Sequence, residues 1–227
     1  MVVEAEIRGT AGGVAGARGR FESGAVLVWN GDILTNAPVS ALLERAHAGD
    51  AQVLAVSPRA LGEGTVGMDG EGNVVRLRGR TFGHEVQSGD YVGVMALGPG
   101  VVARLPEQGC LMADVALPCL AAGGKVATVP SLAPWTDLGD LASYVAANFR
   151  WLDDSGAGAA SWVATGVTVP PGVEVERSLI GAGARLRGRG LLREVIAWPG
   201  APVVAPLTRA VVLGSGRVVP FDETAEN

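Results

Sequence analysis

Two aspartates stand where a carboxylate could bind a metal ion. Asp32 comes directly after the apolar run 24–29, and Asp137 precedes an amphipathic segment. In open α/β sheets, ligands bind beyond the carboxyl ends of the strands, and paired carboxylates there can hold a Mg²⁺ ion that bridges phosphate oxygens. Each residue also has a purely structural interpretation, Asp32 as a turn residue and Asp137 as the N-cap of a helix.

A glycine-rich segment precedes the first of these aspartates. Without side chains, such a loop lets backbone N–H groups approach a bound anion closely, although a merely flexible loop has the same composition. No GK[ST] follows, so the segment is not a Walker loop. A formal GxGxxG at 62–67 opens a predicted hairpin instead of a helix, which argues against a dinucleotide fingerprint. The candidate anion-binding residues are Gly9, Thr10, Ala11, Gly12 and Gly13.

The elements that must position these residues follow from apolar periodicity. Short β-branched runs predict strands at 24–29, 51–56, 90–97 and 125–129. Pro38 and Gly49 delimit a predicted helix over 38–48, and a short helix kinked at Pro118 is expected over 112–122. Spacings of three and four residues predict an amphipathic helix over 137–152. Asp69-Gly70 and Gly72-Asn73 predict a hairpin over 65–77. The order strand, helix, strand is typical of a crossover unit in an α/β sheet.

The periodicity changes in the last third of the chain. Apolar residues recur every six positions, first from Val167 to Leu179 and then from Ile180 to Trp198. A period of six fits neither a helix nor a simple strand and predicts a parallel β-helix of hexapeptide repeats. We therefore expect a first domain over 1–152, a linker over 153–161 and a β-helix domain with its tail over 162–227.

Composition restricts the class of protein. The 227 residues carry a net charge of −5, which argues against a nucleic-acid-binding surface. No signal peptide and no membrane span are expected, and Cys110 and Cys119 are interpreted as two free buried thiols in a reducing compartment. These features predict a cytoplasmic protein.

Taken in order, the motifs GTAGG, VLVWNGDIL, DYVGV and PWTDLGDLASY followed by the six-residue repeats resemble the sugar-phosphate nucleotidyltransferases. The similarity is greatest to the mannose-1-phosphate guanylyltransferase branch, and it runs from about residue 7 to residue 212. It implies a Rossmann-like nucleotidyltransferase sheet, N-terminally incomplete, followed by a short left-handed parallel β-helix. It also implies transfer of a nucleotidyl group from an NTP, with GTP favoured, to a sugar 1-phosphate, with mannose favoured, and release of pyrophosphate.

The resemblance assigns roles to individual residues. The segment Gly9–Gly13 would lie against the nucleotide, Gly93 would face the sugar, and Asp32 and Asp137 would bind the catalytic Mg²⁺. The family's sugar-phosphate lysine is missing, so Arg78, Arg80 or His84 would contact that phosphate, unless this stretch is only a solvated basic loop.

Other family features are also missing. The GxGTRxxP-like and PKPxxP-like segments are not found, and neither is the strand that would lie beside 24–29. We expect an N-terminally incomplete version, an edge covered by another subunit, or a rearranged fold. A non-catalytic regulatory or scaffold subunit that binds a sugar nucleotide is the alternative function. Either protein would form a homo-oligomer or a complex with a complete relative. A hexapeptide acyltransferase is disfavoured because no histidine lies near the repeats.

Overall fold

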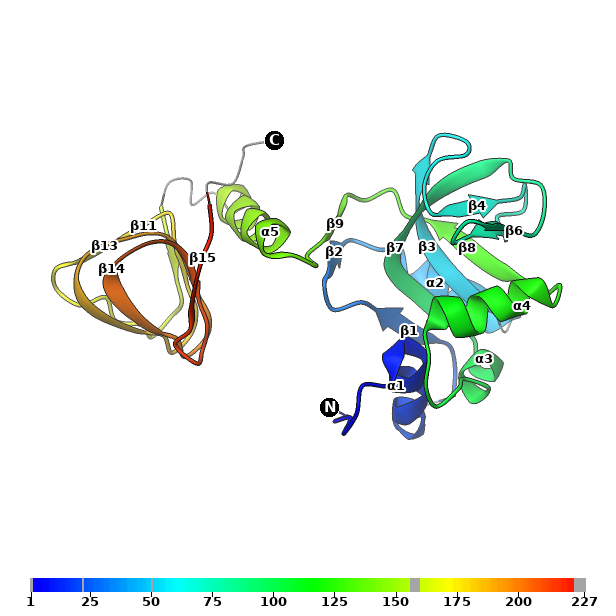
Figure 1. Cartoon of the computed structure of the whole chain (residues 1–227), viewed down its shortest axis with the longest axis horizontal. Helices are drawn as coiled ribbons and strands as arrows, with labels where there is room; N and C mark the ends of the chain where they lie inside the picture. Colours follow the sequence, from blue (N-terminus) through cyan, green and yellow to red (C-terminus); the bar gives the residue numbers. More distant parts are fainter. Residues whose placement is uncertain (1, 22, 50, 156–159, 223–227) are drawn as a thin grey trace. The chain divides into compact units, whose positions relative to one another are not determined.

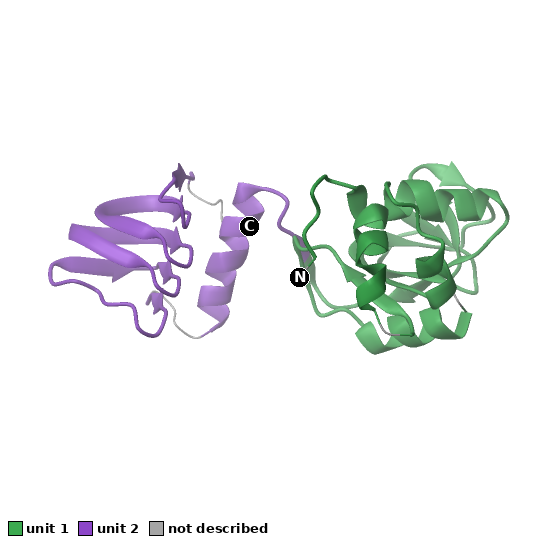
Figure 2. Ribbon diagram, turned by 90° about the horizontal axis from the view of Figure 1, so that it is seen from below, with its two compact units in different colours: residues 1–135 green, residues 136–227 purple. Residues whose placement is uncertain are grey.

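The computed structural model describes the whole chain except residues 1, 22, 50, 156–159 and 223–227 (Figure 1). It divides into two compact units, residues 1–135 and 136–227 (Figure 2). Among the described residues, no helix is long and apolar enough to cross a membrane.

A mixed sheet of seven strands forms the first unit. Its order is β6-β5-β4-β7-β3-β8, and β1 pairs with the second half of β7. Among the described residues of this sheet, β3 and β8 pair in parallel and the other strand pairs are antiparallel. β1 and β3 therefore run in the same direction on either side of β7. The strands are β1 (Val26–Trp29), β3 (Gln52–Arg59), β4 (Val66–Met68), β5 (Val74–Leu77), β6 (Arg80–Thr81), β7 (Gln87–Leu97) and β8 (Val126–Pro130).

Helices cover both faces of this sheet, as expected for the α/β class. On β3, Val53 and Ala55 pack with residues of α2, whereas Leu54 and Val56 pack in the other core cluster, which contains residues of α1, α3, η2 and α4. Burial of successive residues on opposite faces explains the continuous apolar run of this strand. The helices are α1 (Gly9–Ala17), α2 (Val39–Gly49), α3 (Pro99–Ala103) and the continuous pair η2 (Leu111–Ala116) and α4 (Leu117–Ala121).

Most elements of this unit lie close to the ranges predicted from the sequence. The hairpin is formed by β4 and β5, and Asp69 closes its turn by accepting the backbone N–H groups of Glu71 and Asn73. The helix predicted over 112–122 begins with a π-helical turn at Leu111. The remaining short elements are η1 (Arg18–Arg20), β2 (Ile33–Thr35) and β9 (Trp135–Asp137).

The second unit is a β-solenoid of about three turns. Trp162 pairs with Leu179 and Leu179 with Ile196, an offset of 17 residues, and after a register shift between Gly188 and Leu192 the offset to β14 is 15 residues. Ile180 and Leu192 are fully buried in its interior. Trp198, which the six-residue period placed inside, is 44% exposed. The strands are β10 (Trp162–Val163), β11 (Val173–Glu176), β12 (Leu179–Ile180), β13 (Arg185–Ala197), β14 (Pro202–Val212) and β15 (Val218–Pro220).

Helix α5 (Leu141–Asp154) belongs to the second unit. Its apolar side chains cover a stripe of outward-facing solenoid residues, one of which is Leu179, a residue predicted to point inward. The division between the units thus precedes α5, whereas we expected a linker over 153–161. Residues 156–159 of that linker lie outside the described residues. The packed residues are Val145, Phe149 and Leu152 of α5 with Leu179, Ile196 and Val211 of the solenoid.

Candidate functional site

A cavity of about 410 Å³ lies in the first unit. It brings together residues that are far apart in the sequence, among them Thr10 and Arg78 of the predicted site and Asn30, two positions before Asp32. We call it the functional cavity. The residues that line it are Thr10, Asn30, Thr65, Leu77, Arg78, Tyr91, Met95, Cys110, Leu111 and Met112.

The glycine-rich segment is helical, which corrects the expectation of an open loop. The backbone N–H of Ala11 donates to the carbonyl of Gly109 at 2.8 Å, and the Thr10 hydroxyl accepts the N–H of Leu111 at 2.9 Å. A Cβ on Gly12 would lie 2.5 Å from the carbonyl oxygen of Glu107. The small residues therefore allow close packing of α1 on residues 107–111, and of this segment only Thr10 lines the functional cavity.

Gly93 does not itself line the functional cavity, but it bonds to Asn30, which does. It has φ +74 and lies in a bulge of β7. The bulge is seen in the register: Leu54 of β3 pairs with Met95, but Val56 pairs with Tyr91. The carbonyl of Gly93 accepts the N–H of Asn30 at 3.0 Å. Gly93 is thus a positioning residue for the turn that carries Asn30.

The two predicted metal ligands are both exposed. Asp32 lies in the turn between β1 and β2, where the N–H of Ile33 donates to Asn30. One carboxylate oxygen of Asp137 accepts the N–H of Gly139 at 2.9 Å. Asp140, not Asp137, caps helix α5. Asp32 belongs to the first unit and Asp137 to the second, so a metal ion shared by the two stays a prediction.

The three basic candidates are separated by the structure. Arg78 occupies the turn between β5 and β6, at φ 49, and its Nη2 lies 4.0 Å from Sγ of Cys110. Arg80 instead stacks over the ring of Phe82 at 5.6 Å. His84 is exposed, and neither Arg80 nor His84 lines the functional cavity. Of these three residues, Arg78 is the one that lines the functional cavity.

Cys110 is a site residue that sequence reasoning missed. Both cysteines are free, but they are partly exposed, not buried as expected. Burial raises the pKa of the Cys110 thiol, but the N–H groups of Ala113 and Met112, the Thr10 hydroxyl and the Arg78 guanidinium together lower the pKa below its ordinary value. The available signal was a cysteine directly before the start of a helix, where backbone N–H groups stabilise a thiolate.

Tyr91 is the second missed residue. Its hydroxyl is buried in the wall of the functional cavity and has no hydrogen-bond partner within the described part of the chain. Burial raises the pKa of Tyr91, and the charge of the nearby Cys110 raises it further. A buried hydroxyl without a partner favours a bound group that accepts or donates a hydrogen bond.

Comparison with solved structures connects this geometry with a known fold. Two crystal structures of HddC from Yersinia pseudotuberculosis, one complexed with GMP-PN, match at TM-scores of 0.53 and 0.52 and 19% identity. Apo-UDP-glucose pyrophosphorylase matches at a TM-score of 0.50 and 13% identity. The chain has a nucleotidyltransferase fold.

The matches cover 66%, 66% and 68% of this chain, which spans 65%, 65% and 63% of those proteins, respectively. No protein-family model and no curated protein matches the sequence.

Arg78→Gln is expected to slow alkylation of Cys110 by iodoacetamide near neutral pH by roughly two- to fivefold. The lost positive charge raises the thiol pKa and so lowers the thiolate fraction. Peptide-resolved mass spectrometry measures the rate. Arg80→Gln removes the same charge outside the cavity and should leave the rate unchanged; equal slowing by both variants would contradict the assignment.

Proposed function

We propose that this chain is a sugar-1-phosphate nucleotidyltransferase that transfers a nucleotidyl group from an NTP to a sugar 1-phosphate and releases pyrophosphate. One observation carries the proposal: the functional cavity gathers Thr10, Asn30 and Arg78 from three separate motifs of a chain with a nucleotidyltransferase fold. The HddC complex with GMP-PN is a nucleotide complex of a similar fold. Mannose 1-phosphate with GTP is the substrate pair that we favour.

In this proposal Arg78 provides the positive charge that a bound phosphate needs at the cavity wall. Gly93 holds the turn of Asn30 against the cavity through its carbonyl. The sugar phosphate oxygen would attack the α-phosphorus, and the bond between that phosphorus and the pyrophosphate oxygen would break. Holding both phosphates in one cavity aligns this attack.

Asp32 and Asp137 would hold Mg²⁺. No hydrogen bond or ion pair engages the Asp32 carboxylate in the part of the chain that the structure describes, and no group of three or more potential ligands occurs there. Mg²⁺ commonly uses one or two carboxylates together with water and substrate phosphates, so two aspartates fit this ion. The bound ion would neutralise charge on the phosphates.

Pyrophosphate release with Mg²⁺ over a grid of NTPs and sugar 1-phosphates tests the proposal. We expect release with one pair, and its loss in Asp32→Asn, because the neutral amide lacks the negative charge with which a carboxylate holds Mg²⁺. Glu44→Gln, which removes an exposed carboxylate from α2, is the matched control and should retain activity.

Release by no pair would overturn autonomous catalysis. If equilibrium dialysis then showed retained binding of an NDP-sugar, the chain would act as a non-catalytic regulatory or scaffold subunit. Self-association, or association with a complete relative, stays a prediction that sedimentation of the purified protein measures.

A further inference from the structure

The outer edge of β1 is an open strand edge in the first unit. β1 pairs with the second half of β7 on one side, and no described strand pairs with its other side (Figure 1). Val26 and Val28 pack against one core cluster and Leu27 packs against the other. Both faces of this strand are therefore partly covered by the protein, whereas its edge is open.

The backbone groups at this edge follow from the register. The N–H of Asn30 donates to the carbonyl of Gly93, and successive residues of an antiparallel strand point their backbone groups to alternate sides. Val28 therefore bonds to β7, while the N–H and C=O groups of Leu27 and Trp29 point outward. These outward groups have no hydrogen-bond partner in the described part of the chain.

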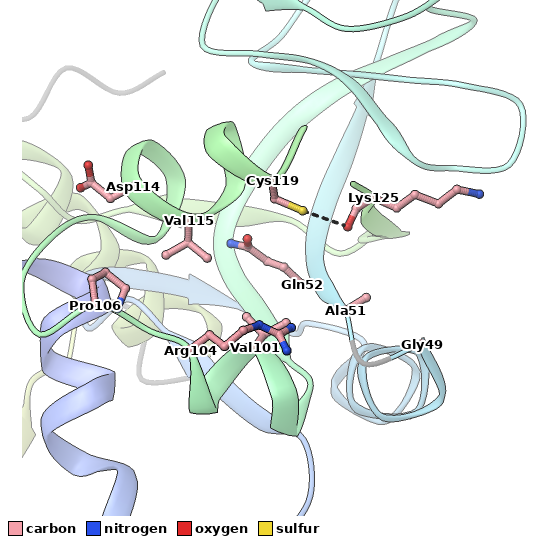
Figure 3. Close-up of a pocket in the computed structure, with 10 residues that line it drawn as sticks. All are labelled: Gly49, Ala51, Gln52, Val101, Arg104, Pro106, Asp114, Val115, Cys119 and Lys125. Atoms are coloured by element: carbon pink, nitrogen blue, oxygen red, sulfur yellow. Dashed lines mark hydrogen bonds between the residues drawn. The ribbon is translucent and has the colours of Figure 1, made fainter. Parts of the chain in front are cut away.

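The strands at the two ends of the sheet order are protected, in contrast to β1. At β8, the N–H of Thr128 donates to the carbonyl of Gly72. The carbonyl of Lys125, directly before that strand, accepts the thiol of Cys119 (Figure 3). β6 is only two residues long and exposes Arg80. Short edge strands, charged side chains and prolines prevent edges from pairing, and β1 has no charge and no proline.

We propose that two copies of this chain pair through β1 and form a dimer with one continuous sheet. A two-fold axis at Val28 places Leu27 of each copy opposite Trp29 of the other. In this register each Leu27–Trp29 pair exchanges both N–H···O bonds, so all the outward groups of the strand are used. The two Val28 side chains meet across the axis, and cross-strand pairs of β-branched and aromatic residues stabilise such a sheet.

This dimer does not depend on the proposed transferase activity, because β1 contains none of the residues assigned to that reaction. One pair of strands is a small contact, so we expect a reversible dimer that dissociates on dilution. Sedimentation velocity over a range of protein concentrations measures it. The expected result is a concentration-dependent shift from monomer to dimer.

A pair of introduced cysteines tests the register. In a non-hydrogen-bonded antiparallel pair the Cα atoms lie about 4.5 Å apart, a distance that a disulfide can span. Val28→Cys should therefore form an intermolecular disulfide under mild oxidation. Leu27→Cys is the matched control and should crosslink at least about tenfold more slowly, because its two copies lie more than about 7 Å apart. Mass spectrometry of unreduced peptides distinguishes these links from any that involve Cys110 or Cys119.

Trp29→Lys tests the edge without a crosslink. Lysine on an edge strand opposes pairing, so the dissociation constant of the dimer should rise at least about tenfold. Leu61→Lys also places a lysine at an exposed apolar position, but outside β1, and should leave the dissociation constant unchanged. Circular dichroism checks that both variants are folded.

A monomer at every concentration would overturn the proposal, as expected if a strand of a different chain covers β1. Equal crosslinking of Val28→Cys and Leu27→Cys would contradict the two-fold register, and a dimer unaffected by Trp29→Lys would place the interface elsewhere. Pyrophosphate release plays no part in these measurements. A failure of the transferase proposal is thus distinguishable from a failure of this one.

Discussion

Gly93→Ala is expected to lower the free energy of unfolding by about 2–5 kcal/mol. Two costs add: the left-handed backbone at φ +74 disfavours alanine by about 1–2 kcal/mol, and overpacking a core typically costs about 1–3 kcal/mol. The added Cβ would lie 2.5 Å from Cγ1 of Ile33 and 3.3 Å from Nδ2 of Asn30. Because Ile33 is buried, it has little room to yield. Denaturant unfolding measures the effect.

Gly79→Ala is the matched control for this experiment. Gly79 has φ +75, but a Cβ there would meet nothing within 4 Å. Gly79→Ala therefore introduces the same backbone strain without a steric conflict, and we expect its free energy of unfolding to fall by about 1 kcal/mol. Equal losses for the two variants would show that contact with Ile33 and Asn30 does not constrain the bulge.

Glu85→Gln is expected to cost about 2–4 kcal/mol at neutral pH, because breaking a largely buried ion pair leaves a charge uncompensated. Nε and Nη2 of Arg76 donate to the two carboxylate oxygens of Glu85 at 2.7 and 2.9 Å, and the Ser88 hydroxyl donates to the same group. The side chains of Arg76 and Glu85 are only 19% and 17% exposed. Arg76 also donates to the carbonyls of Gly64 and Glu63, so this pair connects the hairpin to the loop before it.

The ion pair of Arg76 and Glu85 also predicts that the free energy of unfolding depends on pH. The Arg76 guanidinium, and then the Ser88 hydroxyl, lower the pKa of Glu85 to about 2, from an ordinary value of 4.5. Since the folded-state pKa of Glu85 is the lower one, its contribution to stability, about 3 kcal/mol, is present above pH 4.5 and is lost as the pH falls toward 2. The stability difference between wild type and Glu85→Gln should narrow over that range. Glu71→Gln, at an exposed pair with Lys125, should show neither effect.

Local sequence patterns predicted most strands and helices of the first unit, because the apolar pattern of each segment indicates which of its faces is buried. The alternation of Val53, Leu54, Ala55 and Val56 between two cores produces an uninterrupted apolar run that is readable in one sequence. The surface on which α5 packs could not be predicted from the sequence. A stripe containing Val145 indicates an amphipathic helix, but it does not show which unit that helix covers.

The candidate site was harder to predict because its geometry depends on long-range contacts. The composition of Gly9–Gly13 predicts flexibility, yet bonds to Gly109 and Leu111, a hundred positions away, hold it as a helix. Among the groups that lower the pKa of Cys110, the N–H groups of Ala113 and Met112 come first and are local. The smaller contributions of Thr10 and Arg78 come from distant segments that only the fold brings beside the thiol. The turn at Asn30-Gly31-Asp32, by contrast, was recognisable because an apolar run ends there.

The registers of the two units imply different folding rates. Turns of the solenoid pair residues only 15 to 17 positions apart, for example Ile196 with Val211. In the first unit, Val26 of β1 pairs with Leu97 of β7, about 70 positions later in the chain. Contacts at such separation carry a larger loop-closure entropy and form more slowly. During synthesis, β1 therefore leaves the ribosome well before its partner strand exists, and its apolar sequence stays unpaired until residues 94–97 have been made.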